Sequence, residues 1–221
     1  MLELRDLALD APDGRPLLAG LDLAVPTGGN LLVTGPSGSG KTWLLKVIAG
    51  LECPAGGRVR VAGRDIWPGD GALGMAGRVS VGFAFATGGL LSNLSLAENM
   101  ALPLRFQGLP AAEVQARVRA ALTRLGLDSV ASLRPHAVSA SARKHANLAR
   151  VLALAPAMVL LDDPLEGLDT ADRAIVRELI LAWAADSACT LVIAAEEATS
   201  FSYLEAERLQ LSSMPMPVES P

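Results

Sequence analysis

The sequence predicts an α/β fold, with an antiparallel β part at the N-terminus and a helical lobe inserted into a parallel sheet. Three observations lead to this expectation. Apolar and polar residues alternate over residues 2–25, as in paired β-strands. Apolar residues recur at three-to-four spacing within residues 87–152, as in helices. Helix and strand signals alternate again over residues 157–195, which is typical of a parallel sheet.

The elements are expected in the following order along the chain, within one domain at residues 1–212. After the N-terminal strands come a short apolar strand at 30–34 and a helix at 41–49, then strands at 56–63 and 78–85. The helical lobe at about 87–152 follows, and then a strand at 157–161, a helix at 171–185 and a strand at 189–195. Residues 213–221 have no periodicity and are expected to form a flexible tail.

Composition and charge narrow the class of protein. Of the 221 residues, 51% are hydrophobic, enough to build a core. The longest apolar run, 151–161, is shorter than the roughly 20 residues that cross a bilayer. Because the first residues are charged and only two cysteines are present, we expect a cytoplasmic protein. The net charge of −4 and the lack of a basic run argue against nucleic acid as a partner.

The clearest motif lies between the strand at 30–34 and the helix that follows. Gly35-Pro36-Ser37-Gly38-Ser39-Gly40-Lys41-Thr42 fits the pattern G-x-x-x-x-G-K-[ST] at every specified position. The glycines let backbone N–H groups converge on phosphate oxygens, and the helix adds the positive end of its dipole. Lys41 is expected to reach the β- and γ-phosphates, and the Thr42 hydroxyl to ligate Mg²⁺. The motif predicts a P-loop NTPase fold.

A second motif follows 121 positions after Lys41, where the apolar strand ends in Asp162 and Asp163. A carboxylate at the end of this strand would hold the Mg²⁺ shell, and we assign that role to Asp162. Taken alone, the two carboxylates could equally cap the segment before Pro164. Together with the glycine loop, they favour a magnesium site.

The order of these motifs resembles the ATP-binding subunits of ABC transporters, from Leu2 to about Leu211. Residues 138–145, Val-Ser-Ala-Ser-Ala-Arg-Lys-His, stand where that family carries the signature Leu-Ser-Gly-Gly-Gln. Asp162 ends the strand known as Walker B, and residues 166–169, Glu-Gly-Leu-Asp, resemble the D-loop.

The resemblance implies a RecA-like core that binds ATP and Mg²⁺, and a helical subdomain that docks a membrane permease. It also implies a place on the cytoplasmic face of the inner membrane. Such subunits form head-to-tail dimers, in which each ATP lies between one phosphate loop and the opposite signature. The partner would be a second copy of this chain or a second ATP-binding subunit.

Several positions depart from the family pattern. Ala11 and Pro12 stand where an aromatic residue would stack on adenine, and Ala86 replaces the Q-loop glutamine. Asp163 replaces the catalytic glutamate with a side chain one methylene shorter. Glu196 stands at the position of the switch histidine, where a carboxylate would repel a γ-phosphate. These changes predict slow or lost hydrolysis.

The signature is altered as well. Ala140 and Ser141 replace the two glycines that permit a close backbone approach, while Ser139 remains as an N-cap and a phosphate contact. The other departures affect the site on this chain's own phosphate loop, whereas the signature changes affect the site on the partner's loop. No partner can therefore supply two intact sites.

Two functions stay open at this point. The chain is either a transporter subunit whose nucleotide site is structural or regulatory, or a slow transport ATPase that uses Asp163 as general base. A soluble P-loop kinase is less favoured, because the spacing of the motifs and the D-loop suit ABC subunits better. Residues 91–104 resemble a permease-facing stretch, and they equally fit a helix capped by Ser95 and Glu98. Trp43 and His145 are expected to be packing or surface residues.

Overall fold

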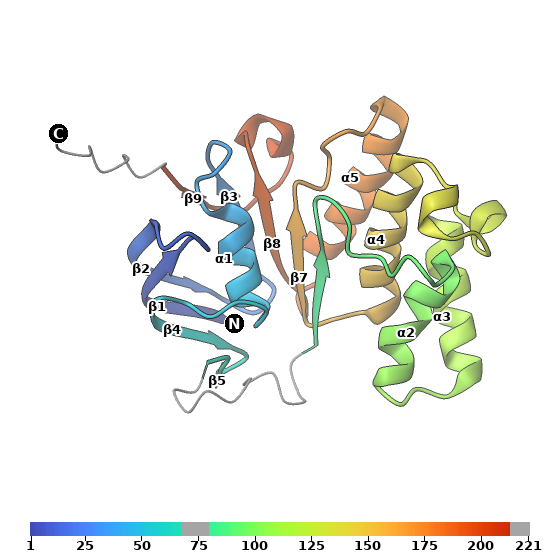
Figure 1. The fold of residues 1–221 in the computed structure, drawn as a ribbon, viewed down its shortest axis with the longest axis horizontal. Helices are drawn as coiled ribbons and strands as arrows, with labels where there is room; N and C mark the ends of the chain where they lie inside the picture. The colour runs from blue at the N-terminus through green and yellow to red at the C-terminus, as the bar shows by residue number, and fades with distance from the viewer. Residues whose placement is uncertain (68–79, 213–221) are drawn as a thin grey trace. The chain divides into compact units, whose positions relative to one another are not determined.

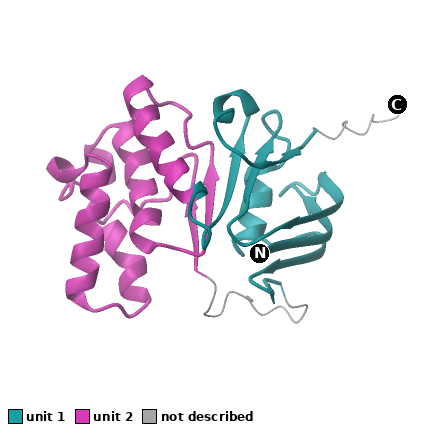
Figure 2. Cartoon of the chain, turned by 180° about the vertical axis from the view of Figure 1, so that it is seen from behind, with its two compact units in different colours: residues 1–79, 184–221 teal, residues 80–183 magenta. Residues whose placement is uncertain are grey.

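The computed structural model describes residues 1–67 and 80–212. The chain forms two compact units, which Figure 2 colours separately. Unit 1 contains residues 1–79 and 184–221, and unit 2 contains residues 80–183. Unit 2 includes two strands and one further helix besides the expected helical lobe, so it is larger than residues 87–152.

Unit 1 contains a four-stranded antiparallel sheet in the order β2-β1-β4-β5 (Figure 1). The strands are β1 (Leu2–Asp10), β2 (Pro16–Val25), β4 (Gly56–Val61) and β5 (Arg64–Asp65). Leu2 and Leu4 are buried, and so are Leu7 and Leu9, which breaks the strict alternation of the strand. The register shifts between Leu4 and Leu7, where Asp6 has a φ of 45°. This bulge lets both leucine pairs face the core.

The second sheet segment of unit 1 is parallel and positions the phosphate loop. β3 (Asn30–Thr34) lies between β8 (Thr190–Ala195) and β9 (Glu207–Gln210), and it leads into α1 (Lys41–Ile48). Every residue of β8 is buried. In the register, Thr34 lies opposite Ala195 on one side and Gln210 on the other. The carboxyl ends of these strands therefore meet at one edge, where the residues after β3 form the predicted loop.

Unit 2 combines a parallel strand pair with four helices (Figure 1). β6 (Val81–Ala84) pairs with β7 (Met158–Asp162), and Ala84 lies opposite Leu161. The helices are α2 (Leu96–Phe106), α3 (Ala111–Arg124), α4 (Ala140–Leu154) and α5 (Thr170–Ala184), with short 3-10 turns at Asp128–Val130 and Pro135–Ala137. α4 packs against α2, α3 and β6 and forms the centre of this unit.

The start of α2 shows how local sequence sets an element boundary. The Ser95 hydroxyl accepts a hydrogen bond from Glu98 N–H at 3.2 Å, and the Glu98 carboxylate accepts from Ser95 N–H at 2.8 Å. This reciprocal capping box satisfies two N–H groups at the helix start. The helical part of the lobe thus begins at Leu96 rather than near residue 87, because residues 86–95 form an irregular segment.

Most of the expected elements are present, with boundaries that shift by a few residues. The strand expected at 78–85 is observed as Val81–Ala84, and its first two residues lie outside the described part, as does the expected tail at 213–221. The two elements missed by the sequence analysis are β5 and β9, besides the short 3-10 turns. No helix in the two described ranges is long and apolar enough to cross a membrane.

Candidate functional site

The phosphate loop of unit 1 closes around the side chain of Lys41. The Lys41 ammonium donates to the carbonyl oxygens of Gly35 at 2.7 Å and of Pro36 at 2.9 Å, and the residue is only 7% exposed. A lysine held this way is a cation inside a ring of backbone, where an incoming phosphate can replace the carbonyls as its partner. The predicted role of Lys41 therefore fits its position.

Two positions of the loop require glycine, one because of its backbone conformation and the other because a side chain would not fit. Gly40 is the N-cap of α1 and has a φ of 93°, in the left-handed region. A Cβ on Gly35 would lie 2.3 Å from the Leu211 carbonyl oxygen and 2.8 Å from Ser39 Oγ. The first turn of α1 carries no acidic residue. The helix start thus directs backbone N–H groups at the loop without a competing carboxylate, which favours a bound anion.

Ser39 shows that this loop fits a phosphate group. The residue is 2% exposed, and its hydroxyl oxygen is buried without a hydrogen-bond partner among the described residues. Buried polar atoms are normally paired, so an unpaired hydroxyl inside a glycine loop is a contact that a phosphate oxygen can complete. Thr42, the next predicted ligand, is exposed on the first turn of α1.

Glu196 emerges next to the phosphate loop. It directly follows β8, and Ala195 pairs with Thr34 in the parallel register, so Glu196 and Gly35 leave adjacent strands at the same edge. Glu196 is exposed. The structure therefore brings the predicted switch position and the predicted phosphate loop together within unit 1.

In unit 2, the two predicted carboxylates lie at the end of β7. Asp162 is its last residue and is 3% exposed, and Asp163 follows with a φ of 41°. Aspartate tolerates this left-handed conformation better than most residues, because its short polar side chain can bond locally. A buried carboxylate at a strand end and a threonine hydroxyl are both oxygen donors of the kind that Mg²⁺ takes.

Lys144 of α4 holds the segment that follows these carboxylates. Its ammonium donates to the carbonyl oxygens of Asp163 at 2.8 Å and of Glu166 at 2.5 Å. Burial lowers the pKa of Lys144, and the carboxylates of Glu166, Asp163 and Asp162 act in the opposite direction. No sequence motif marks this residue, although Lys144 is one of only three lysines in the chain.

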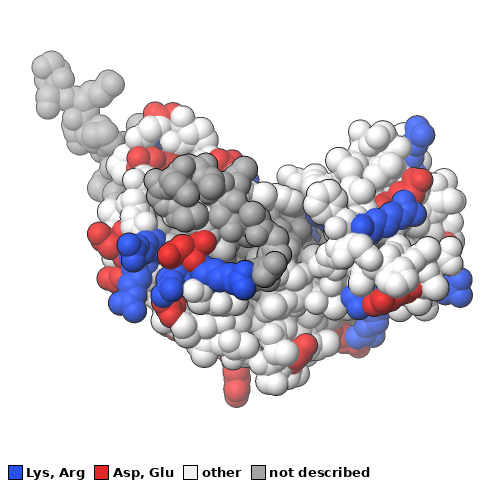
Figure 3. All heavy atoms as spheres, turned by 90° about the horizontal axis from the view of Figure 1, so that it is seen from below, with Lys and Arg blue, Asp and Glu red and all other residues white. Residues whose placement is uncertain are grey.

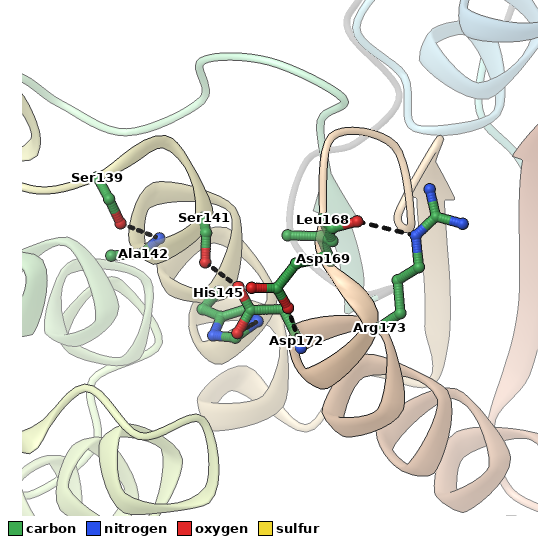
Figure 4. A network of polar contacts seen from close by, with 8 residues as sticks. All are labelled: Ser139, Ser141, Ala142, His145, Leu168, Asp169, Asp172 and Arg173. Atoms are coloured by element: carbon green, nitrogen blue, oxygen red, sulfur yellow. Dashed lines mark hydrogen bonds and ion pairs between the residues drawn. The ribbon is translucent and has the colours of Figure 1, made fainter.

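The altered signature forms the N-terminus of α4. Ser139 is the N-cap, and its hydroxyl accepts from Ala142 N–H at 3.1 Å, so Ala140 and Ser141 are the first two helical residues. The Ser141 hydroxyl donates to one carboxylate oxygen of Asp172 in α5 (Figure 4). His145 Nε2 lies 3.6 Å from the other oxygen of the same carboxylate. The residue at the second glycine position is therefore bonded to α5.

The expected D-loop caps α5. The Asp169 carboxylate accepts from Asp172 N–H at 2.9 Å, and Arg173 Nε donates to the Leu168 carbonyl at 2.9 Å (Figure 4). Asp172 thus contacts the D-loop through its backbone N–H and α4 through its carboxylate. The D-loop and the signature helix are thus joined through side chains of α5.

The segment around Ala86 is held by α4. Asn147 donates to the Gly88 carbonyl at 2.5 Å, and Arg150 donates to the Gly89 carbonyl and, at 3.3 Å, to the Phe83 carbonyl. Burial lowers the pKa of Arg150. The sequence analysis did not single out either side chain.

A cavity of about 450 Å³ lies beside this segment within unit 2. Its lining includes Ala86 and Gly88, Ser141 and Lys144 of α4, and Glu166. The small side chain of Ala86 therefore faces open volume rather than a packed neighbour.

These features define the class of protein: an α/β nucleotide-binding protein with a P-loop. Residues 18–166 match the family described as ABC transporter, so the chain belongs to that family and is an ATP-binding domain of it. The P-loop NTPase fold expected from the sequence is confirmed by this match and by the structural neighbours described below.

Two relatives illustrate the range of the family. The lipoprotein-releasing system ATP-binding protein LolD of Chromohalobacter salexigens is 36% identical over 185 residues, which cover 83% of this chain and 78% of that protein. The methionine import ATP-binding protein MetN of Caulobacter vibrioides is 37% identical over 191 residues, 85% of this chain. The chain spans only 56% of the length of that second relative.

The fold matches solved ATP-binding cassettes. The dimeric structure of the bacterial ABC transporter cassette MJ0796 aligns with a TM-score of 0.86 and 25% identity, over 96% of this chain and 94% of that one. A post-hydrolysis dimer of the same cassette, bound to ADP and Pi, aligns with the same TM-score at 24% identity and supports the fold alone.

Proposed function

We propose that this chain is the ATP-binding subunit of an ABC transporter that binds Mg-ATP and hydrolyses it slowly or not at all. Nucleotide binding is inferred from the phosphate loop. The Lys41 ammonium bonds to carbonyls of the loop, and the Ser39 hydroxyl is buried there without a partner among the described residues. Membership of the ABC family supports ATP as the nucleotide. Thr42 and Asp162 are the proposed Mg²⁺ ligands, because both supply oxygen donors.

The weak hydrolysis is inferred from the residues that should split the bound nucleotide. Asp163 is one methylene shorter than glutamate, and a general base must come within hydrogen-bond reach of its water. Glu196 emerges beside the phosphate loop, where its negative charge opposes a γ-phosphate. The side chain of Ala86 has no polar atom that could bind a ligand in the cavity that it lines. Each change removes or opposes a contact that catalysis needs.

A slow transport ATPase is the second candidate. It is favoured by Lys144, which holds the backbone of Asp163 and could keep that carboxylate in a fixed place as general base. The third possibility from the sequence, a soluble P-loop kinase, does not agree with the family match over residues 18–166.

Binding is tested by calorimetry with Mg-ATP. The purified chain is expected to take up one Mg-ATP, and Lys41→Ala is expected to weaken binding at least about tenfold, since a charge-assisted contact to phosphate contributes about 1.5–3 kcal/mol. Arg58→Ala removes an exposed cation elsewhere in unit 1 and should bind normally. If the unmodified chain takes up no Mg-ATP, or if Lys41→Ala binds as well as the unmodified chain, this proposal fails.

Hydrolysis is tested by single-turnover experiments at saturating Mg-ATP. We expect a rate at or near the background, which Asp163→Asn leaves unchanged. Asp163→Glu should then raise the rate about tenfold or more, because it restores the reach of the base. Turnover clearly above the background that disappears in Asp163→Asn would instead establish Asp163 as a working general base and the chain as an ATPase.

The partners are inferred from the same family resemblance. We propose that the helical part of unit 2 docks a membrane permease, which would place the chain on the cytoplasmic face of the inner membrane. Leu91, Leu102 and Phe106 support this, because they are apolar and exposed on or next to α2, Phe106 by 94%. On the face shown in Figure 3, the described Lys and Arg side chains lie near Asp and Glu, which does not favour nucleic acid.

We further propose a head-to-tail dimer, with a second copy or with a second ATP-binding subunit. Ser139 would contact the nucleotide on the partner's loop. Ser141 is bonded to Asp172 and cannot offer the bare backbone of glycine, so that site should also be weakened. Each of the two sites of the proposed dimer therefore carries altered residues from this chain, one on its own phosphate loop and one at its signature.

A further inference from the structure

Unit 1 lacks an aromatic residue at the turn that precedes β2. The turn after Asp10 is closed by a hydrogen bond from Ala11 N–H to the Arg15 carbonyl at 2.8 Å. Leu17 of β2 lies next to the phosphate loop, because a Cβ added to Gly40 would be 3.3 Å from the Cβ of Leu17. Aliphatic contacts of this kind bury a base but give no stacking partner, and stacking on an aromatic ring is a large part of base affinity in many nucleotide sites.

Trp43 places an indole at the start of the phosphate-binding helix. Its backbone belongs to the first turn of α1, because the first hydrogen bond of the helix runs from Leu44 N–H to the Gly40 carbonyl at 2.8 Å. The N–H groups before Leu44 point out of the helix start, toward the loop. A polyphosphate bound there comes next to the backbone of Trp43, and the rest of the nucleotide extends from that point.

Trp43 is partly exposed, and its indole has a lysine side chain beside it. Lys46, one turn further along α1, places its ammonium 5.0 Å from the centre of the Trp43 ring. This cation–π contact is on one ring face. Lys46 is also 4.0 Å from the Glu52 carboxylate, which helps to keep the ammonium in place. Within the described ranges, no aromatic side chain stacks on Trp43.

The other described aromatic residues of unit 1 pack against each other or donate to a backbone carbonyl. Phe201 is 2% exposed, and Tyr203 lies against it with ring centroids 6.2 Å apart. The indole N–H of Trp67 donates to the Val47 carbonyl at 3.2 Å, near the opposite end of α1 from the loop. In the described part of this unit, Trp43 is thus the aromatic residue that is partly exposed and whose backbone lies beside the phosphate loop.

We infer that Trp43 stacks on the base of the bound nucleotide and supplies, from the phosphate-binding helix, the aromatic contact that residues 11 and 12 lack. This inference rests on the proposed function, because it needs a nucleotide in the loop. Base and phosphate are then recognised by one continuous segment, residues 35–43. Trp43 is a binding residue that sets preference for a base-bearing ligand over a bare polyphosphate.

The experiment compares Mg-ATP with magnesium tripolyphosphate, which carries the phosphates and no base. Mg-ATP is expected to quench tryptophan emission of the unmodified chain, whereas tripolyphosphate does not. The quench should be absent in Trp43→Phe, although Trp67 and Trp183 remain. Trp43→Ala should lose about 5- to 100-fold in affinity for Mg-ATP, as expected for one base stack, and keep its affinity for tripolyphosphate. Trp67→Phe is the matched control and should behave as the unmodified chain.

Three outcomes would overturn the inference while leaving the proposed function standing. They are unchanged Mg-ATP affinity in Trp43→Ala, parallel losses of Mg-ATP and tripolyphosphate affinity, and a quench that tripolyphosphate reproduces. The ligand comparison on the unmodified chain needs no substitution, so it can overturn the inference even if Trp43→Ala does not fold, and Trp43→Phe assigns the quench to Trp43. If the unmodified chain binds neither ligand, the proposed function itself is wrong.

Discussion

Several of the side chains that hold the candidate site together are not those named by its motifs. Lys144, Asn147 and Arg150 project from α4 and donate to main-chain carbonyls in the segments that follow β7 and β6. They bring no chemistry of their own to a phosphate. Their effect is to hold the loops that carry Asp163 and Ala86, so the geometry of the altered positions depends on them.

Lys144 gives a prediction about stability. Lys144→Met should lower the free energy of unfolding by about 1–3 kcal/mol, because two hydrogen bonds from a charged donor are lost. Because burial lowers the pKa of Lys144 below the ordinary 10.5, the unfolded chain binds more protons there as pH rises through that range. The stability difference between the unmodified chain and Lys144→Met should therefore grow with pH just below 10.5.

Urea unfolding at several pH values measures this difference. Lys46→Met makes the same substitution at a partly exposed lysine on α1 and is measured alongside as the control. A difference for Lys144→Met that is constant or shrinks with rising pH would contradict the argument from burial.

At the scale of elements, the phosphate loop depends on close backbone packing as well as on charge. Gly35 and Gly38 both have positive φ, but only Gly35 has no room for a Cβ. Gly35→Ala should therefore cost about 1–3 kcal/mol more in unfolding free energy than Gly38→Ala, since the Leu211 carbonyl must move. Thermal unfolding of the two variants gives the comparison, and equal losses would show that conformation alone matters.

The elements also show how far the sequence could be interpreted. Strands such as β3 and β8 were predicted closely, because continuous apolar runs between turn residues mark a buried parallel strand. β9, Glu-Arg-Leu-Gln, was missed because it is mostly polar and joins the sheet only through its backbone pairing with β3. The contacts of Lys144 and Asp172 were missed because each joins residues about 20 or 30 positions apart without a spacing rule.

For the whole molecule, the proposed function requires an outside partner, and the exposed side chains of unit 2 make that requirement testable. Phe106→Ser should lower the affinity for the permease about 30-fold, as for a central aromatic contact in an interface. The measurement is the amount of membrane subunit that co-purifies with the tagged chain after detergent extraction. Leu181→Ser, an exposed apolar residue on α5, should retain it. Equal retention by both variants would exclude Phe106 as a docking contact.

The bond between Ser141 and Asp172 makes the residue at the start of α4 depend on the residue that faces it from α5. If glycine replaced Ser141 alone, the carboxylate of Asp172 would lose its hydroxyl donor beside His145. That substitution would leave a polar group of unit 2 without this partner and lower the stability of the helix pair. Positions 141 and 172 are thus interdependent, and a glycine at the first would be tolerated best together with a change at the second.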